Sequence, residues 1–163
     1  MKKKNILIIL AVLAIITTGY IFLYKISSKL DIDLDIDECK IISENDDHQG
    51  FHGDGDFILK ADCSKNNKKI LKQVKKWKKL PLSENLQLIM YGGERDNKTY
   101  GYELAKKNNI PEIKNGYYYF LDRDSDAANI HSDLSLFDRY SFNFTIVMYD
   151  LDTNILYYYE FDT

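Results

Sequence analysis

An uncharged run near the amino terminus constrains this chain more than any other feature. Residues 6–24 contain no charged side chain, and the three lysines at positions 2–4 precede them. As an α-helix at about 1.5 Å per residue, a run of this length spans roughly 29 Å, close to the ~30 Å hydrocarbon core of a bilayer. A helix that is apolar on every side would otherwise need a large core around it. The run therefore predicts a single transmembrane helix.

A cleaved signal peptide is the alternative for the same segment. Such a peptide has a shorter apolar region followed by small residues at the cut. Thr17 and Gly19 offer a weak cleavage site, but apolar residues resume at positions 20–23 and Lys25 closes the run. We therefore expect an uncleaved single-pass anchor.

The lysines around the anchor predict its orientation. Basic residues collect on the cytoplasmic side of a membrane helix, and the amino end carries more of them than the far side, where Lys25 and Lys29 lie. The rest of the chain is then exported from the cell, and the protein is placed at the cell membrane. The expected organisation is a cytoplasmic basic end (1–5), a transmembrane anchor (6–24), a juxtamembrane stalk (25–33) and an extracytoplasmic α+β domain (34–163).

Charge excludes one class of partner. The net charge is −3, and because the first thirty residues carry five lysines and no acid, the remaining residues are net −8. A domain this acidic is poorly suited to bind nucleic acid phosphates over a broad surface. Membrane, envelope protein and glycan partners stay open.

Hydrophobic periodicity predicts the fold class of the exported part. Alternating and aromatic-rich stretches indicate strands, and the spacing of Ile70, Val74 and Trp77 indicates a helix that Pro81 ends. The pattern favours an α+β fold with a mainly antiparallel sheet of about six strands and two or three helices. The expected strands are 34–42, 57–63, 86–91, 116–121, 142–149 and 155–161; the expected helices are 65–79 and 100–107, while 132–140 is ambiguous.

The two cysteines, Cys39 and Cys63, lie on opposite arms of a predicted hairpin. In an exported domain they can form a disulfide, which would contribute roughly 3 kcal/mol. The alternative is a pair of small buried thiols that never oxidise. Both states stay open.

The polar loop of this hairpin, residues 46–56, is the richest candidate site. It holds two histidines and four aspartates, of which His48, His52, Asp54 and Asp56 could bind zinc or another divalent ion. A metal-binding or metal-dependent hydrolytic domain is therefore one hypothesis. The alternative is a solvated turn in which Asp and Gly serve loop geometry.

Signatures of other chemistry are missing from the sequence. There is no HExxH motif, no GxSxG nucleophile motif, no phosphate-binding loop and no dinucleotide-binding fingerprint. No catalytic residue is therefore assigned, and the enzyme hypothesis is disfavoured. We expect no cofactor, and a divalent metal at the loop is the alternative.

Two further features suit binding. Residues 65–79 contain eight lysines and no acid, which would attract anionic lipids or polyanions, although such lysines also simply solubilise a packed helix. The thirteen tyrosines include runs at 117–119 and 157–159, whose rings must alternate between faces of a strand. Exposed tyrosines would suit a glycan or protein partner, whereas buried ones would form a thin core.

Several stretches together carry a resemblance. They are the 51–55 turn, Trp77 with the following 80–82, residues 110–120, and 140–145 leading into 157–161. In these the chain resembles a group of small uncharacterised membrane-anchored or exported proteins of Gram-positive bacteria. The resemblance implies a bacterial envelope location and supplies no activity. The sequence thus favours an anchored extracytoplasmic domain that binds a protein or envelope ligand.

Overall fold

The computed structural model describes residues 39–48, 53–124, 127 and 129–163. These residues belong to one compact unit, Cys39–Thr163, with its own hydrophobic core. The predicted basic end, anchor and stalk, and residues 34–38, lie outside the described residues. Within the described part, no helix has the length and apolar character needed to cross a membrane.

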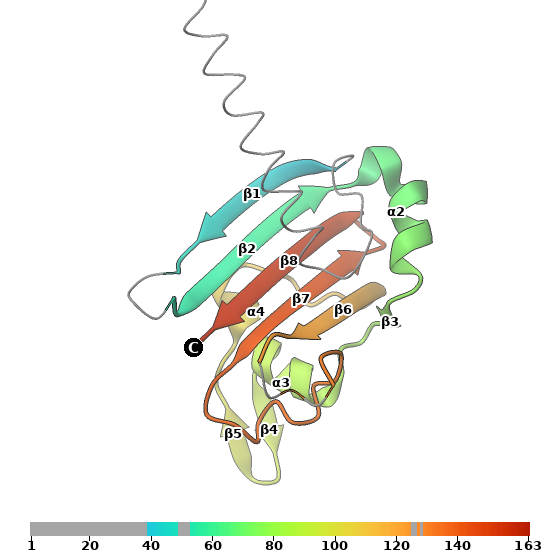
Figure 1. The fold of residues 1–163 in the computed structure, drawn as a ribbon. Coiled ribbons are helices and arrows are strands. Elements are labelled where there is room, and N and C mark those ends of the chain that lie inside the picture. Colours follow the sequence, from blue (N-terminus) through green and yellow to red (C-terminus); the bar gives the residue numbers. More distant parts are fainter. Residues whose placement is uncertain (1–38, 49–52, 125–126, 128) are drawn as a thin grey trace, which may run out of the picture. The chain divides into compact units, whose positions relative to one another are not determined.

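The unit is an α+β fold built on a six-stranded sheet in which every neighbouring pair is antiparallel (Figure 1). The strand order is β1-β2-β8-β7-β6-β3. The strands are β1 (Lys40–Asp46), β2 (Gly55–Asp62), β3 (Lys78–Lys79), β6 (Gly116–Asp122), β7 (Asn143–Asp150) and β8 (Ile155–Asp162). A small separate hairpin pairs β4 (Gly93–Arg95) with β5 (Lys98–Tyr100).

Three short α-helices accompany the sheet: α2 (Asn67–Val74), α3 (Glu84–Tyr91) and α4 (Leu104–Lys107). A 3-10 turn, Ser64–Asn66, leads into α2. The predicted α+β class with a mainly antiparallel sheet is confirmed for the folded unit: about six strands and two or three helices were expected, and the structure has a six-stranded sheet, a separate two-stranded hairpin and three short α-helices.

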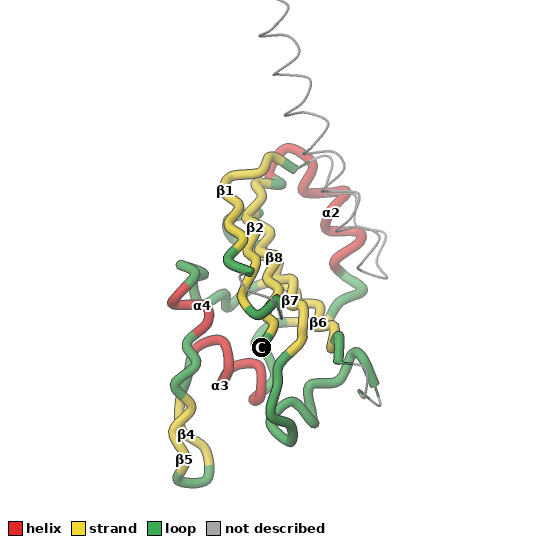
Figure 2. The backbone as a smooth tube through the Cα atoms, turned by 60° about the vertical axis from the view of Figure 1, so that its left-hand side comes forward, coloured by secondary structure: helices red, strands yellow, loops and turns green. Residues whose placement is uncertain are grey.

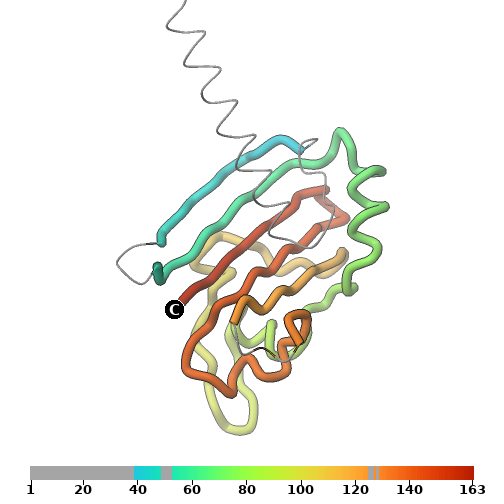
Figure 3. Tube along the Cα trace, viewed as in Figure 1, coloured from blue at the N-terminus to red at the C-terminus, as the bar shows by residue number. Residues whose placement is uncertain are grey.

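The last two strands of the chain lie in the middle of the sheet, between β2 and β6 (Figure 3). Asp150 and Thr153 hold the turn between β7 and β8, because the aspartate accepts hydrogen bonds from the Thr153 hydroxyl and the Asp152 amide. Seven of the eight β7 residues are buried, which agrees with strands covered on both faces. Their long apolar runs made this hairpin the clearest prediction from sequence.

The two faces of the sheet carry different helices. α3 and α4 pack on the face formed by side chains such as Phe120, Phe144 and Tyr159, and this is the main core. α2 lies over the opposite face (Figure 2), where the Trp77 ring contacts that of Tyr119, 6.0 Å between centroids. Neighbouring residues of a strand point to opposite faces, so Phe120 and Tyr119 serve one face each.

Residues 86–91 were expected to form a strand, and this expectation is wrong. They form α3, because Ser83 caps its start with its hydroxyl on the Leu86 amide and Gly92 ends it with φ 77°. Leu86, Ile89 and Met90 have helical spacing and are buried. Leu86 and Leu88 flank Gln87, which matches the two-residue period of a strand and led to the wrong expectation.

Other boundaries also differ from expectation. The α-helix expected over 65–79 stops at Val74, since Trp77 packs on the sheet and Lys78–Lys79 pair with β6 as an edge strand. The helix expected over 100–107 begins at Leu104. The first strand runs to Asp46 instead of 42, so the following loop is shorter than expected.

Candidate functional site

The hairpin loop at the end of β1 and β2 was the predicted metal site, and His48 is its best-defined member. The His48 ring lies between two carboxylates: Nδ1 is 2.7 Å from Asp46 Oδ1, and Nε2 is 3.0 Å from Asp162 Oδ2. Asp162 is the last residue of β8, so the sheet brings it beside a residue far away in sequence. Arg123 also contacts this carboxylate, with Nη2 2.9 Å from Oδ1.

These contacts change the protonation of His48. Partial burial lowers the pKa of the imidazole, but the hydrogen bonds and charges of Asp46 and Asp162 outweigh burial and raise the pKa above its ordinary value of 6.5. The protonated ring can donate to both carboxylates at once. The arrangement therefore works as an ion-pair network that joins β1 to β8.

Asp56, another predicted ligand, points away from His48. Asp56 lies on the opposite face of β2, where its Oδ2 accepts hydrogen bonds from Asn108 Nδ2 at 2.7 Å and the Tyr159 hydroxyl at 2.9 Å. Asp54 is exposed, and His52 lies outside the described residues. Across the described ranges no group of three His, Cys, Asp or Glu side chains is arranged to hold a metal ion. Because His52 is not among the described residues, the metal hypothesis stays a prediction.

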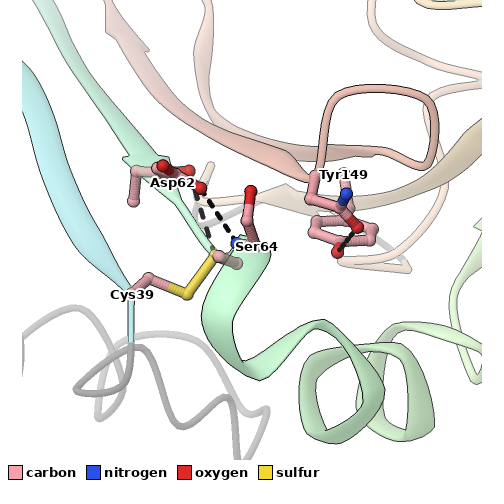
Figure 4. The surroundings of a disulfide bond; sticks show 7 residues. Cys39, Asp62, Ser64 and Tyr149 are labelled. Carbon is pink, nitrogen blue, oxygen red and sulfur yellow. Dashed lines mark hydrogen bonds between the residues drawn. A yellow bond between two sulfur atoms is a disulfide. The ribbon is translucent and has the colours of Figure 1, made fainter.

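Cys39 and Cys63 form a disulfide with Cα atoms 4.3 Å apart (Figure 4). It joins the start of β1 to the end of β2. Of the two states that the sequence left open, a disulfide or two buried free thiols, the structure has the disulfide. Beside it, the Asp62 carboxylate accepts a hydrogen bond of 2.9 Å from the Ser64 amide. Hydrogen bonds from Ser64 lower the pKa of Asp62 below its ordinary value.

A pocket that sequence reasoning missed lies at the amino end of α3, and we call it the α3 pocket. Its volume is about 350 Å³. It forms because residues 133–138 fold back beside the start of α3, where the Ser83 hydroxyl donates to Asp133 Oδ2 at 2.5 Å and Asn85 Nδ2 donates to the Asp133 carbonyl at 2.7 Å. The lining residues are Ser83, Glu84, Asn85, Arg95, Asp133, Leu134, Phe137 and Asp138.

Arg95, the last residue of β4, gives the α3 pocket its one cationic group. Its guanidinium carbon lies 5.3 Å from the centre of the Tyr100 ring and 5.4 Å from that of Phe137. Nη1 donates to Asn85 Oδ1, and Nη2 lies 3.4 Å from the Tyr100 hydroxyl. The contact with Tyr100 raises the pKa of Arg95, so the group stays charged. Aromatic packing and hydrogen bonds thus fix the guanidinium in place.

The loop that forms the pocket wall also exposes apolar side chains. Four large hydrophobic residues are exposed among the described residues, and three of them, Ile130, Leu134 and Tyr140, belong to this loop or its flank. The tyrosines of the strands behave differently: Tyr157, Tyr158 and Tyr159 are all buried. The 157–159 run therefore belongs to the core, Tyr118 is buried between the half-buried Tyr117 and Tyr119, and Tyr140 is the tyrosine exposed among the described residues.

On the other face of the sheet, α2 presents lysines to solvent. We call Lys65, Lys68, Lys69, Lys72, Lys75 and Lys76 the α2 basic face; all six are exposed. Ile70 and Val74, on the opposite side of the helix, are buried.

The α3 pocket could not be read from the sequence because its parts come from three separate segments. Ser83 followed by Glu84 is a recognisable helix start. Nothing local, however, links that start to Arg95 or to residues 133–138, which have no periodic pattern. No protein-family model, no curated protein and no solved structure is recognisably similar to this chain.

Proposed function

We propose that this chain is a single-pass, membrane-anchored extracytoplasmic domain that binds a glycan of the cell envelope in the α3 pocket. The anchor at residues 6–24 is inferred from its length and lack of charge. The disulfide Cys39–Cys63 supports the compartment, because disulfides persist in oxidising surroundings outside the cytoplasm.

The observation that carries the proposal is the combination of groups around the α3 pocket. Arg95 has five N–H donors and uses two of them on Asn85 and Tyr100, which leaves donors for a ligand. Glu84 and Asp138 add exposed carboxylates, which accept hydrogen bonds. Sugar hydroxyls both donate and accept, and the C–H face of a sugar ring packs against an aromatic ring such as Phe137.

The size of the pocket is consistent with a small ligand. Its volume of about 350 Å³ is within the range of roughly 300 to 1,000 Å³ that is typical of small-molecule sites. We therefore expect one or two sugar units to be bound, with the rest of the glycan outside.

Binding of residues 25–163 to an array of bacterial envelope glycans tests the proposal. We expect a defined set of glycans to bind, and Arg95→Ala to weaken that binding by about tenfold or more, equivalent to roughly 1.4 kcal/mol. Lys98→Ala, on the neighbouring β5, is the matched control and leaves binding unchanged. Binding that is equally strong in Arg95→Ala, or no binding to any glycan, contradicts the proposal.

A protein partner is the second candidate, favoured by the exposed Ile130, Leu134 and Tyr140. Ile130→Ser with Tyr140→Ser, two exposed residues that do not line the α3 pocket, would then abolish capture of the partner but leave glycan binding intact. The remaining alternative, a metal-binding or hydrolytic domain centred on residues 46–56, depends on His52.

A further inference from the structure

The α2 basic face is a one-sided charged surface. Its six lysines occupy a segment that contains no acid. Ile70 and Val74 of α2 are buried between them, and Trp77, just after the helix, is buried as well. Within α2, at about 100° of rotation per residue, Lys68 and Lys72 fall on the side away from the buried Ile70 and Val74, and the exposed Lys76 lies in the turn that follows the helix. The apolar side of α2 is thus buried in the domain. Its solvent-facing side carries the lysines and is cationic.

The position of this surface along the chain is the second observation. The disulfide joins Cys39 to Cys63, two residues before Lys65, so the chain that arrives from the anchor enters the domain beside the α2 basic face. The residues between the anchor and Cys39 are 25–38, which can reach at most roughly 50 Å when fully extended. With the anchor of the proposed function, this tether keeps Cys39, and the α2 basic face beside it, within reach of the membrane surface.

We propose that the α2 basic face lies against the anionic phospholipid headgroups of the membrane that holds the anchor. This inference rests on the anchoring part of the proposed function and not on the glycan. A lysine ammonium is a compact point charge that suits a diffuse layer of phosphates. Clusters of lysines near an anionic leaflet are attracted to it, and the attraction falls off within a Debye length.

The structure specifies how this contact differs from insertion of an amphipathic helix. An inserting helix buries its own apolar side in the acyl region. In α2 that side packs on the sheet, and Trp77, the only tryptophan, is buried. The contact is therefore purely electrostatic: added salt weakens it, and the fluorescence of Trp77 does not shift. α3 lies on the other face of the sheet from α2 (Figure 2), so the α3 pocket at its amino end would then face away from the bilayer.

Lysine labelling of the full chain in nanodiscs tests the proposal. The protein is reconstituted in discs of phosphatidylcholine alone or of phosphatidylcholine with one third phosphatidylglycerol, and a water-soluble acylating reagent is applied. We expect Lys68, Lys72 and Lys76 to be labelled several-fold more slowly in the anionic discs. The exposed lysines Lys98, Lys107 and Lys114 serve as internal controls and are labelled equally in both.

A second experiment uses a protein without the anchor. It can therefore test the lipid contact of the α2 basic face separately from the membrane anchor. Residues 25–163, which retain the compact unit, are sedimented with vesicles of the same two compositions. Lys68→Glu/Lys72→Glu/Lys76→Glu should lower binding to anionic vesicles roughly a hundredfold. Lys98→Glu/Lys107→Glu/Lys114→Glu, with the same change in net charge, should lower it far less.

Several results would overturn the inference. Equal labelling in both kinds of disc would do so, as would equal effects of the two triple variants. Binding by 39–163 but not by 25–163 would show that the acidic residues 31–38 occupy the face instead of lipid. A full chain that does not enter nanodiscs refutes the anchor, and the vesicle arm then decides on the lysine surface alone.

Discussion

His48 and Asp162 are 114 positions apart in the chain, yet the imidazole Nε2 lies 3.0 Å from a carboxylate oxygen of Asp162. The contact ties the loop after β1 to the last residues of β8. Asp46 binds the other ring nitrogen, and Arg123 shares the Asp162 carboxylate. His48, a residue that the sequence marks as a metal ligand, is thus held to the sheet by its ion pairs with two aspartates.

This network predicts a pH-dependent part of the stability. The pKa of His48 is raised in the folded state, so protonation favours folding. The contribution is fully present below the unfolded value of 6.5 and is lost as the pH rises through the higher folded value. In urea unfolding, the free energy of unfolding of the wild type should therefore exceed that of His48→Gln at acid pH, and this difference should become smaller toward alkaline pH. A difference in unfolding free energy that grows toward alkaline pH would contradict the raised pKa of His48.

The disulfide should stabilise the domain. The two cysteines are 24 residues apart, and closing a loop of that size in the unfolded chain contributes about 3 kcal/mol. Cys39→Ala/Cys63→Ala should lose roughly this free energy of unfolding in urea, and reduction of the wild type should have a similar effect. Titration of the unfolded, unreduced protein should find no free thiol; two reactive thiols would refute the pairing.

Arg139 should be among the residues most sensitive to substitution. Its guanidinium makes two hydrogen bonds of 2.8 Å to the carboxylate of Asp122, which is 1% exposed. Removal of one partner leaves a buried charge uncompensated, which costs about 3 to 5 kcal/mol. Arg139→Met should lower the unfolding free energy by this amount. The double variant Arg139→Met/Asp122→Leu should recover part of it; no recovery would argue against an unpaired charge as the cause.

Addition of zinc tests whether residues 46–56 bind a metal ion or form a solvated turn. Because both ring nitrogens of His48 are engaged by carboxylates, we expect zinc to leave the melting temperature of the purified domain unchanged. Stoichiometric zinc in the purified protein, lost in His48→Ala/His52→Ala, would instead favour the metal-binding alternative.

The parts of the fold that local pattern determines were predictable, and the parts that depend on distant contacts were not. The β7–β8 hairpin has long apolar strands around a polar turn, so its sequence alone identifies it. In 86–91 the spacing of the apolar residues fitted both a strand and a helix, and the caps Ser83 and Gly92 decided for the helix. α2 ends before Trp77, whose ring packs on Tyr119 of β6, and the local sequence does not indicate this tertiary contact.

The candidate sites divide in the same way. Composition identified residues 46–56 as polar and rich in histidine and aspartate, but the pleat of β2 sends Asp56 to one face while His48 binds Asp162 on the other. The α3 pocket needs Arg95 next to Ser83 and Asp133, an arrangement that only the folded chain creates.

The most direct measurement of the central claim is the location of the carboxyl terminus in living bacteria. The proposed anchor places the folded unit outside the cytoplasm, so a carboxyl-terminal alkaline phosphatase fusion should be active and the matching green fluorescent protein fusion, exported unfolded, should be dark. A dark phosphatase fusion beside a fluorescent one would place the domain in the cytoplasm and contradict the account.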